Sequence, residues 1–116
     1  MTNQGFIYER AAETFLRQAG LELIERNFRG DHGEIDLIML DYETLVFIEV
    51  RQRRNSRFYS AAGSVSAQKQ SRIIKTALAF LKANPKYQNT YCRFDVMAYR
   101  DLYDSPLWIK SAFTEE

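Results

Sequence analysis

The chain has 116 residues and a formal net charge of +1, and 46% of its residues are hydrophobic. This length and apolar content suit one folded domain over residues 1–116 and exclude a disordered chain. Cys92 is the only cysteine and His32 the only histidine, so an internal disulfide and a Cys/His zinc cluster are excluded.

Residues 5–19 carry apolar side chains at helical spacing, and Gly20 follows as a helix stop. Residues 21–29 alternate between apolar and polar side chains well enough for a strand, and residues 30–33 predict a turn. The chain therefore begins with a helix and a strand, each ending at a glycine.

A β-hairpin is predicted over residues 34–51. Residues 35–40 and 45–50 are apolar runs of strand length, rich in β-branched and aromatic side chains. The short polar segment between them predicts a tight turn centred on Tyr42 and Glu43.

Two carboxylates meet on this predicted hairpin. In the register set by the turn, Asp36 lies opposite Glu49 and Glu34 opposite Arg51, with Cβ atoms about 5 Å apart. Like charges this close are unfavourable on an otherwise apolar sheet, and a divalent cation would relieve the repulsion. Magnesium is held by one or two carboxylates with water and phosphate oxygens, so Asp36 and Glu49 are candidate metal ligands. In the structural alternative, either acid reaches solvent or pairs with Arg51, and a bulge would break the register.

The second half of the chain predicts a loop, a helix and two strands. Residues 52–65 lack periodicity, and a helix is expected over residues 66–83 with Ser66 as its N-cap. Strands follow at residues 91–100 and 107–113. The order of the elements predicts an α/β fold, with a mixed five-stranded sheet flanked by helices.

Charge is distributed unevenly along the chain. From residue 51 to residue 94 there are ten basic residues and no acidic one, and all 15 acids lie outside that segment. Such asymmetry predicts a face that attracts polyanions such as nucleic acid. The alternative is a solvated basic helix without a partner.

Several short motifs occur in a specific order. They are Glu9 with Ala11-Ala12, Glu25-Arg26-Asn27-Phe28-Arg29, Gly33-Glu34-Ile35-Asp36-Leu37-Ile38, Val46-Phe47-Ile48-Glu49-Val50-Arg51, Lys69 with Arg72-Ile73, and Arg93-Phe94-Asp95-Val96. In this order the chain resembles the small bacterial YraN proteins of the PD-(D/E)XK restriction-endonuclease-like superfamily, which are similar to archaeal Holliday-junction resolvases. The resemblance covers nearly the whole chain and implies a restriction-endonuclease-like fold.

The resemblance implies a role for each matching residue of the site. Asp36 and Glu49 would hold magnesium or manganese, and Glu9 of the first helix would lie near the metal. Arg51 stands where active members carry a lysine that positions the attacking water and stabilises the phosphate. Arginine keeps the charge, but it stays protonated and is bulkier, which suits binding with weak or absent cleavage.

A basic surface is expected beside these acids, because the loop after Glu49 leads directly into the second helix. Its expected members are Arg53, Arg54 and Arg57 of the loop, and Gln68, Lys69, Arg72 and Lys75 of the helix. Backbone contacts of this kind would hold a nucleic acid without reading its sequence.

These features predict a nuclease-like protein that binds DNA, at branched or single-stranded structures, and acts as a magnesium-dependent endonuclease. The alternative is a catalytically inactive nucleic-acid-binding or adaptor module that retains the nuclease fold. The resolvase-like resemblance implies a homodimer. No apolar run is long enough to cross a bilayer and no signal peptide is visible, so we expect a cytoplasmic protein without membrane contact.

Overall fold

The computed structural model describes residues 3–53 and 64–115, with side chains from residue 5 onward. These ranges contain the helices α1 (Asn3–Gln18) and α3 (Ala67–Ala83) and the short 3-10 helix η1 (Pro85–Tyr87). They also contain the strands β1 (Glu22–Gly30), β2 (Gly33–Asp41), β3 (Thr44–Gln52), β4 (Tyr91–Tyr99) and β5 (Leu107–Phe113). The predicted helices and strands are confirmed, with ends that differ by no more than two residues. None of the described helices has the length and apolar character to cross a membrane.

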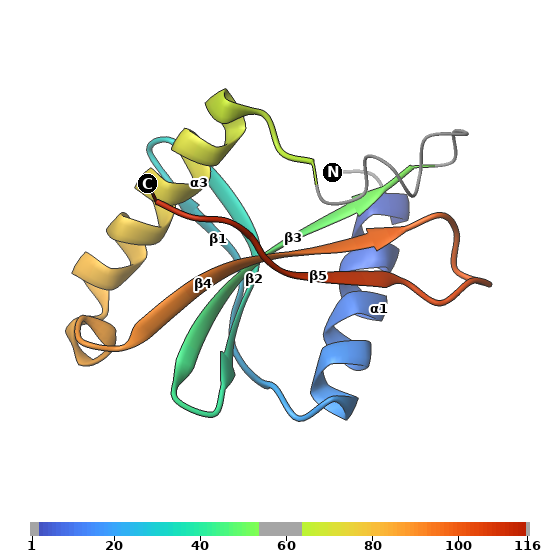
Figure 1. The fold of residues 1–116 in the computed structure, drawn as a ribbon, viewed down its shortest axis with the longest axis horizontal. Coiled ribbons are helices and arrows are strands. Elements are labelled where there is room, and N and C mark those ends of the chain that lie inside the picture. The colour runs from blue at the N-terminus through green and yellow to red at the C-terminus, as the bar shows by residue number, and fades with distance from the viewer. Residues whose placement is uncertain (1–2, 54–63, 116) are drawn as a thin grey trace.

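The strands form one mixed sheet in the order β1-β2-β3-β4-β5 (Figure 1). β3 and β4 run parallel, and the other neighbouring strands run antiparallel. A parallel pair needs a crossover connection, and here the chain between β3 and β4 contains α3. The predicted α/β architecture, a mixed five-stranded sheet flanked by helices, is confirmed and is compatible with a restriction-endonuclease-like fold.

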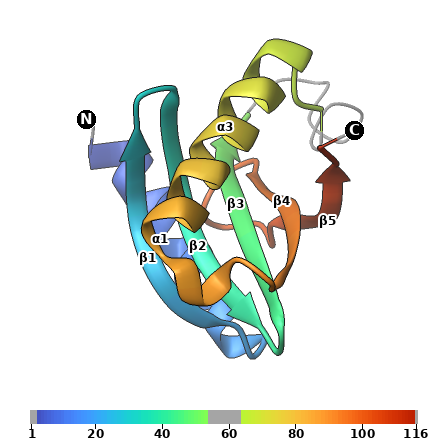
Figure 2. The same ribbon diagram turned by 90° about the vertical axis from the view of Figure 1, so that its left-hand side faces the viewer.

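The two helices cover opposite faces of the sheet (Figures 1 and 2). α1 buries Ala12 and Leu16 in one hydrophobic cluster, which we call the α1-side core. α3 buries Ile73 and Phe80 in a second cluster, the α3-side core. On both helices the apolar positions recur at helical spacing, so each helix presents one apolar stripe to the sheet.

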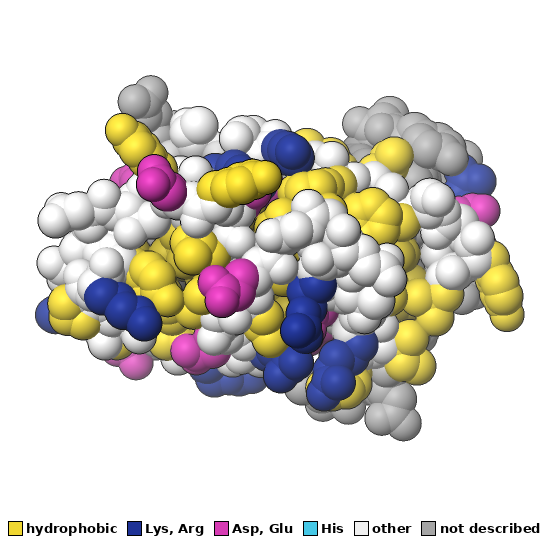
Figure 3. All heavy atoms as spheres, turned by 90° about the horizontal axis from the view of Figure 1, so that it is seen from below, with side chains coloured by type: hydrophobic (Ala, Val, Ile, Leu, Met, Phe, Trp, Pro, Cys, Tyr) yellow, Lys and Arg dark blue, Asp and Glu magenta, His cyan; other side chains and the backbone are white. Residues whose placement is uncertain are grey.

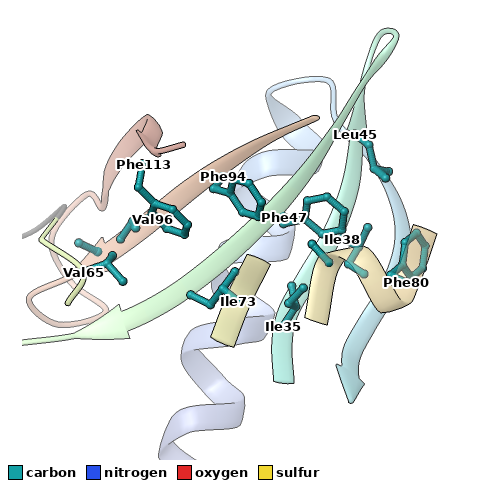
Figure 4. Close-up of a cluster of buried hydrophobic side chains, with 12 residues drawn as sticks. Ile35, Ile38, Leu45, Phe47, Val65, Ile73, Phe80, Phe94, Val96 and Phe113 are labelled. Atoms are coloured by element: carbon teal, nitrogen blue, oxygen red, sulfur yellow. The ribbon is translucent and has the colours of Figure 1, made fainter. Parts of the chain in front are cut away.

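Aromatic rings fill the α3-side core (Figure 4). The ring of Phe80 meets those of Phe28 and Phe47 edge-on, with centroids 5.2 and 6.1 Å away. Phe47 in turn stacks on Phe94 at 5.5 Å. These contacts join α3 to three strands, so the helix is held at a fixed place over the sheet.

The predicted ends of α3 are also confirmed. Ser66 Oγ accepts a hydrogen bond from the backbone N–H of Lys69 at 3.2 Å, as an N-cap does. The helix ends at Ala83, and its C-cap Asn84 immediately precedes Pro85. The cap fixes the first turn of α3, which carries Lys69.

A buried charged cluster joins β4 to β5. Asp95 is fully buried and accepts hydrogen bonds from Arg93 Nε at 3.1 Å, from the Trp108 indole N–H at 2.9 Å and from the Ser111 backbone N–H at 2.9 Å. Arg93 also donates to Asp41 at 2.9 Å. These hydrogen bonds offset the cost of burying the carboxylate of Asp95. We therefore assign this cluster a structural role.

Candidate functional site

The candidate site lies where the ladder between β2 and β3 ends. The predicted register is confirmed from the turn as far as Leu37 opposite Ile48. Within the described residues the ladder stops at that pair. The backbone N–H of Val50 donates instead to Asp36 Oδ2 at 2.8 Å. A carboxylate therefore takes the place that a strand carbonyl would have, and this holds Asp36 against β3.

The predicted pairing does not continue beyond Leu37 and Ile48: among the described residues, neither Asp36 with Glu49 nor Glu34 with Arg51 is a ladder pair. Glu34 forms an ion pair with Arg29 of β1, at 3.7 Å. β2 still pairs with β1 over this stretch, up to Gly30 opposite Gly33. β2 thus leaves β3 while staying with β1, and the acids lie at the point of separation.

Both strands of the β1–β2 ribbon change face at this point. Residues two apart on a strand normally share a face. However, Ile35 packs in the α3-side core and Leu37 in the α1-side core. On β1, Phe28 packs against the α3-side core, whereas Arg26 reaches an acid of α1. Between these two lies Asn27, whose φ of 49° is left-handed.

The surroundings of Asp36 raise its pKa and so favour its neutral form. Loss of hydration on burial raises the pKa of Asp36 from 3.8 to about 8, and the charge of Glu49 is the next largest cause. The hydrogen bond from Val50 acts in the opposite direction, and the charges of Glu9 and Glu34 add to the rise. The acids of β2, β3 and α1 are therefore close enough to act on one another.

α3 supplies a cation to the acid pair. Lys69 Nζ lies 3.0 Å from Glu49 Oε1, and the two side chains are 40% and 12% exposed. The lysine is placed by the first turn of α3, whose N-cap is Ser66. The site therefore combines acids from the hairpin with a cation from the crossover helix.

Arg51 stands beside this pair in the sequence but makes a different contact. Its guanidinium donates to the backbone carbonyl of Ser64, in the segment that leads into α3. Burial lowers the pKa of Arg51, and the charge of Glu49 opposes this effect. The charge of Glu49 therefore acts on Arg51, but the ion pair with Glu49 is made by Lys69.

Glu9 approaches the acids from α1. Asn27 Nδ2 donates to Glu9 Oε1 at 2.8 Å. The preceding residue, Arg26, donates two hydrogen bonds to Glu13 of α1, at 2.6 and 2.9 Å. The sequence motifs include Asn27 but give it no role. An asparagine inside a predicted strand is nonetheless a signal, because asparagine tolerates left-handed backbone.

The donors at the site fit a hard divalent cation. Within the described parts of the chain, no group of three or more His, Cys, Asp or Glu side chains is arranged to hold a metal ion. Two carboxylates completed by water and substrate phosphate are nonetheless the set that magnesium takes in phosphate-handling sites. A bound cation would offset the causes that raise the pKa of Asp36, which are first its burial and then the charge of Glu49. Asp36 and Glu49 are the residues that would hold magnesium or manganese.

The predicted basic surface is seen only in part. Arg53, Gln68, Arg72 and Lys75 are exposed, while Arg54 and Arg57 lie outside the described residues. Figure 3 shows the end of the molecule that carries the β2–β3 turn, where basic and acidic side chains are interspersed with hydrophobic ones. Basic side chains therefore also occur away from the acid pair, and charge alone does not mark the site.

Comparison with known proteins finds one family. The family model described as "Uncharacterised protein family UPF0102" matches residues 8–99. A UPF0102 protein of Psychromonas ingrahamii is 42% identical over 113 residues, which cover 97% of this chain and 91% of that protein. One from Pseudomonas putida is 43% identical over 115 residues, covering 97% and 94%. One from Psychrobacter cryohalolentis is 48% identical over 104 residues, but these cover 85% of this chain and only 60% of that longer protein.

Proposed function

This chain belongs to the uncharacterised protein family UPF0102, and we propose that it is a metal-dependent nuclease-like protein that binds DNA and hydrolyses its phosphodiester bonds. The predicted resemblance to YraN-like proteins of the PD-(D/E)XK type is confirmed by the family match. The proposal is carried by one observation, the meeting of Asp36, Glu49 and Lys69 where β2 separates from β3. Two acids and a lysine at the end of a hairpin can hold a cation and a phosphate together.

The residues divide the chemistry between them. Asp36 and Glu49 would hold the cation, which when bound supplies charge to the scissile phosphate and lowers the pKa of water. Lys69, a point charge on a flexible stem, would donate a hydrogen bond to a non-bridging phosphate oxygen. The attacking water would lose one proton to solvent as its oxygen bonds to phosphorus. The bond from phosphorus to the leaving sugar oxygen would break, and that oxygen would take up a proton from solvent.

The exposed basic residues near α3 would hold the DNA. Arg53, Arg72 and Lys75 are positioned by the chain segments that adjoin Glu49 and Lys69. Contacts to phosphates fix the register of a duplex or single strand without reading its bases. We therefore propose a substrate defined by its shape, such as branched or single-stranded DNA, rather than by its sequence.

The test is cleavage of plasmid and four-way junction DNA in magnesium or manganese. Asp36→Asn and Glu49→Gln should each abolish nicking, because each removes a carboxylate that holds the cation. Asp31→Asn, in the exposed turn between β1 and β2, is the matched control and should cut like the wild type. If both acid variants cut as fast as the wild type, the activity belongs to a contaminant and the proposal is wrong.

A second candidate function follows from Arg51. Its guanidinium is engaged with the Ser64 carbonyl, at the position where a catalytic lysine would stand. In this alternative, the protein binds nucleic acid as an adaptor that retains the nuclease fold, without cleavage. Binding would then need no metal and would weaken steeply with salt, because phosphate contacts release counterions.

The two functions are separated by three variants. If Lys69 serves the reaction, Lys69→Met removes cleavage and Arg51→Ala retains it. Should only Arg51→Lys cut DNA, the wild type is a disabled nuclease and the adaptor function is favoured. If no form cuts and the wild type still binds junction DNA in EDTA, the adaptor function stands.

A further inference from the structure

The left-handed residue of β1 lets two consecutive side chains reach the same helix. Neighbouring residues on a strand normally point to opposite faces. Arg26 and Asn27 nevertheless both bind acids of α1, namely Glu13 and Glu9. The φ of 49° at Asn27 makes this possible. Left-handed backbone costs free energy for any residue other than glycine, and it persists only where surrounding contacts stabilise it.

The two contacts differ in the burial of the acid and in the charge of its donors. Glu13 is buried and is held by two arginines, Arg26 and Arg17, so its charge is fully compensated by cations. Glu9 is half-buried, and its hydrogen bond comes from a neutral amide. An amide donor fixes the position of a carboxylate and, unlike an arginine, brings no positive charge to it.

The position of Asn27 across the ribbon connects it to the acid pair. Arg26 pairs with Leu37, and Phe28 pairs with Ile35. Asn27 therefore lies between two pairs whose β2 partners flank Asp36. The charge of Glu9 is also among those that act on Asp36. Asn27, which binds Glu9, thus lies on β1 beside Asp36, at the point where β2 separates from β3.

We propose that Asn27 is a positioning residue for the metal site, whose amide holds the carboxylate of Glu9 beside Asp36 and Glu49. This inference rests on the proposed function. Glu9 would act from outside the two metal ligands, on the water that completes the shell of the cation. Partners of this outer kind orient a site, and their loss typically weakens metal binding about 10- to 100-fold.

The experiment is a calorimetric titration of Mn²⁺ into metal-free protein. Asn27→Gly removes the amide and relieves the left-handed backbone, and Asn27→Asp keeps the shape and the tolerance for that backbone but cannot donate. Each should weaken Mn²⁺ binding about tenfold or more, as should Glu9→Gln. In the Glu9→Gln background, Asn27→Gly should have no further effect, because its partner is already neutral.

Arg26→Ala is the matched control, because it breaks the neighbouring contact between the same strand and the same helix. It should lower thermal stability but leave Mn²⁺ affinity within about twofold of the wild type. A purely structural role for Asn27 would make the Arg26 and Asn27 variants behave alike. If Asn27→Gly or Glu9→Gln binds Mn²⁺ like the wild type, or if their losses multiply in the double variant, this inference is wrong and the proposed function stands. If the wild type binds no Mn²⁺ while it remains folded, the proposed function fails as well.

Discussion

Replacing Asp36 by asparagine should stabilise the protein at neutral and alkaline pH. Asparagine keeps the shape and can still accept the Val50 N–H through Oδ1. Burial and Glu49 raise the pKa of Asp36 from 3.8 to about 8 in the folded protein. The folded state therefore favours the protonated acid, and its contribution is lost as pH rises from about 4 toward 8. One pKa unit is about 1.4 kcal/mol, so the wild type loses at most about 4 kcal/mol by pH 7.

The assay is urea unfolding in EDTA at pH 5, 6, 7 and 8. We expect the free energy of unfolding of Asp36→Asn, minus that of the wild type, to rise by about 1 kcal/mol per pH unit up to pH 7. The ion-paired Glu13 has a lowered pKa, so its contribution is lost only at lower pH and cancels in the difference. Asp31→Asn is the control and should follow the wild type. Equal slopes for Asp36→Asn and the wild type would refute the reasoning, as would a less stable Asp36→Asn at pH 8.

Three further predictions concern other parts of the molecule. Lys69→Met should leave Mn²⁺ affinity in calorimetry unchanged or higher, because Glu49 loses its competing cation. Nicking by this variant should fall about 100-fold. Nicking equal to that of the wild type would exclude the lysine from the reaction. Replacing Arg53 and Arg54 together by alanine should lower the slope of log affinity against log salt by about two units, one per phosphate contact, whereas an unchanged slope in the folded variant would mean that they contact no phosphate. Asp95→Ala should cost about 3–5 kcal/mol in urea unfolding, because its buried donors lose their acceptor; a loss below 1 kcal/mol would contradict that role.

The hairpin shows how much of the site the sequence predicts. Two apolar runs joined by one short polar turn are enough to set the register, because the length of the turn fixes which residues lie opposite each other. The turn centres on Tyr42 and Glu43 as predicted, with Tyr42 at a φ of 54°. From that register the approach of Asp36 to Glu49 follows, and so does the crowding of charge between them.

The separation of β2 from β3 could not be predicted in the same way. It coincides with the left-handed backbone of Asn27 on a third strand, and no local pattern around Asp36 predicts it. The contact of Lys69 with Glu49 depends on how α3 sits on its aromatic core, and that is set by residues such as Phe80 and Phe28, far apart in the sequence. The β2–β3 separation and the Lys69–Glu49 contact therefore depend on tertiary packing, which residue patterns and spacing do not predict.

The parallel pairing of β3 with β4 has a consequence for the order in which the site is assembled. Asp36 and Val50, which meet through the hairpin, are 14 residues apart in the chain. Lys69 can reach Glu49 only after α3 has docked and the crossover has closed. Loop closure favours contacts close in sequence, so we expect the hairpin to form early in folding and the crossover late. During folding, Asp36 and Glu49 would then come together before Lys69 docks with α3. Protonation of Asp36 would reduce the repulsion between the two acids while the hairpin forms. Refolding should accordingly be faster below pH 7 than above pH 8 in the wild type, and independent of pH over that range in Asp36→Asn.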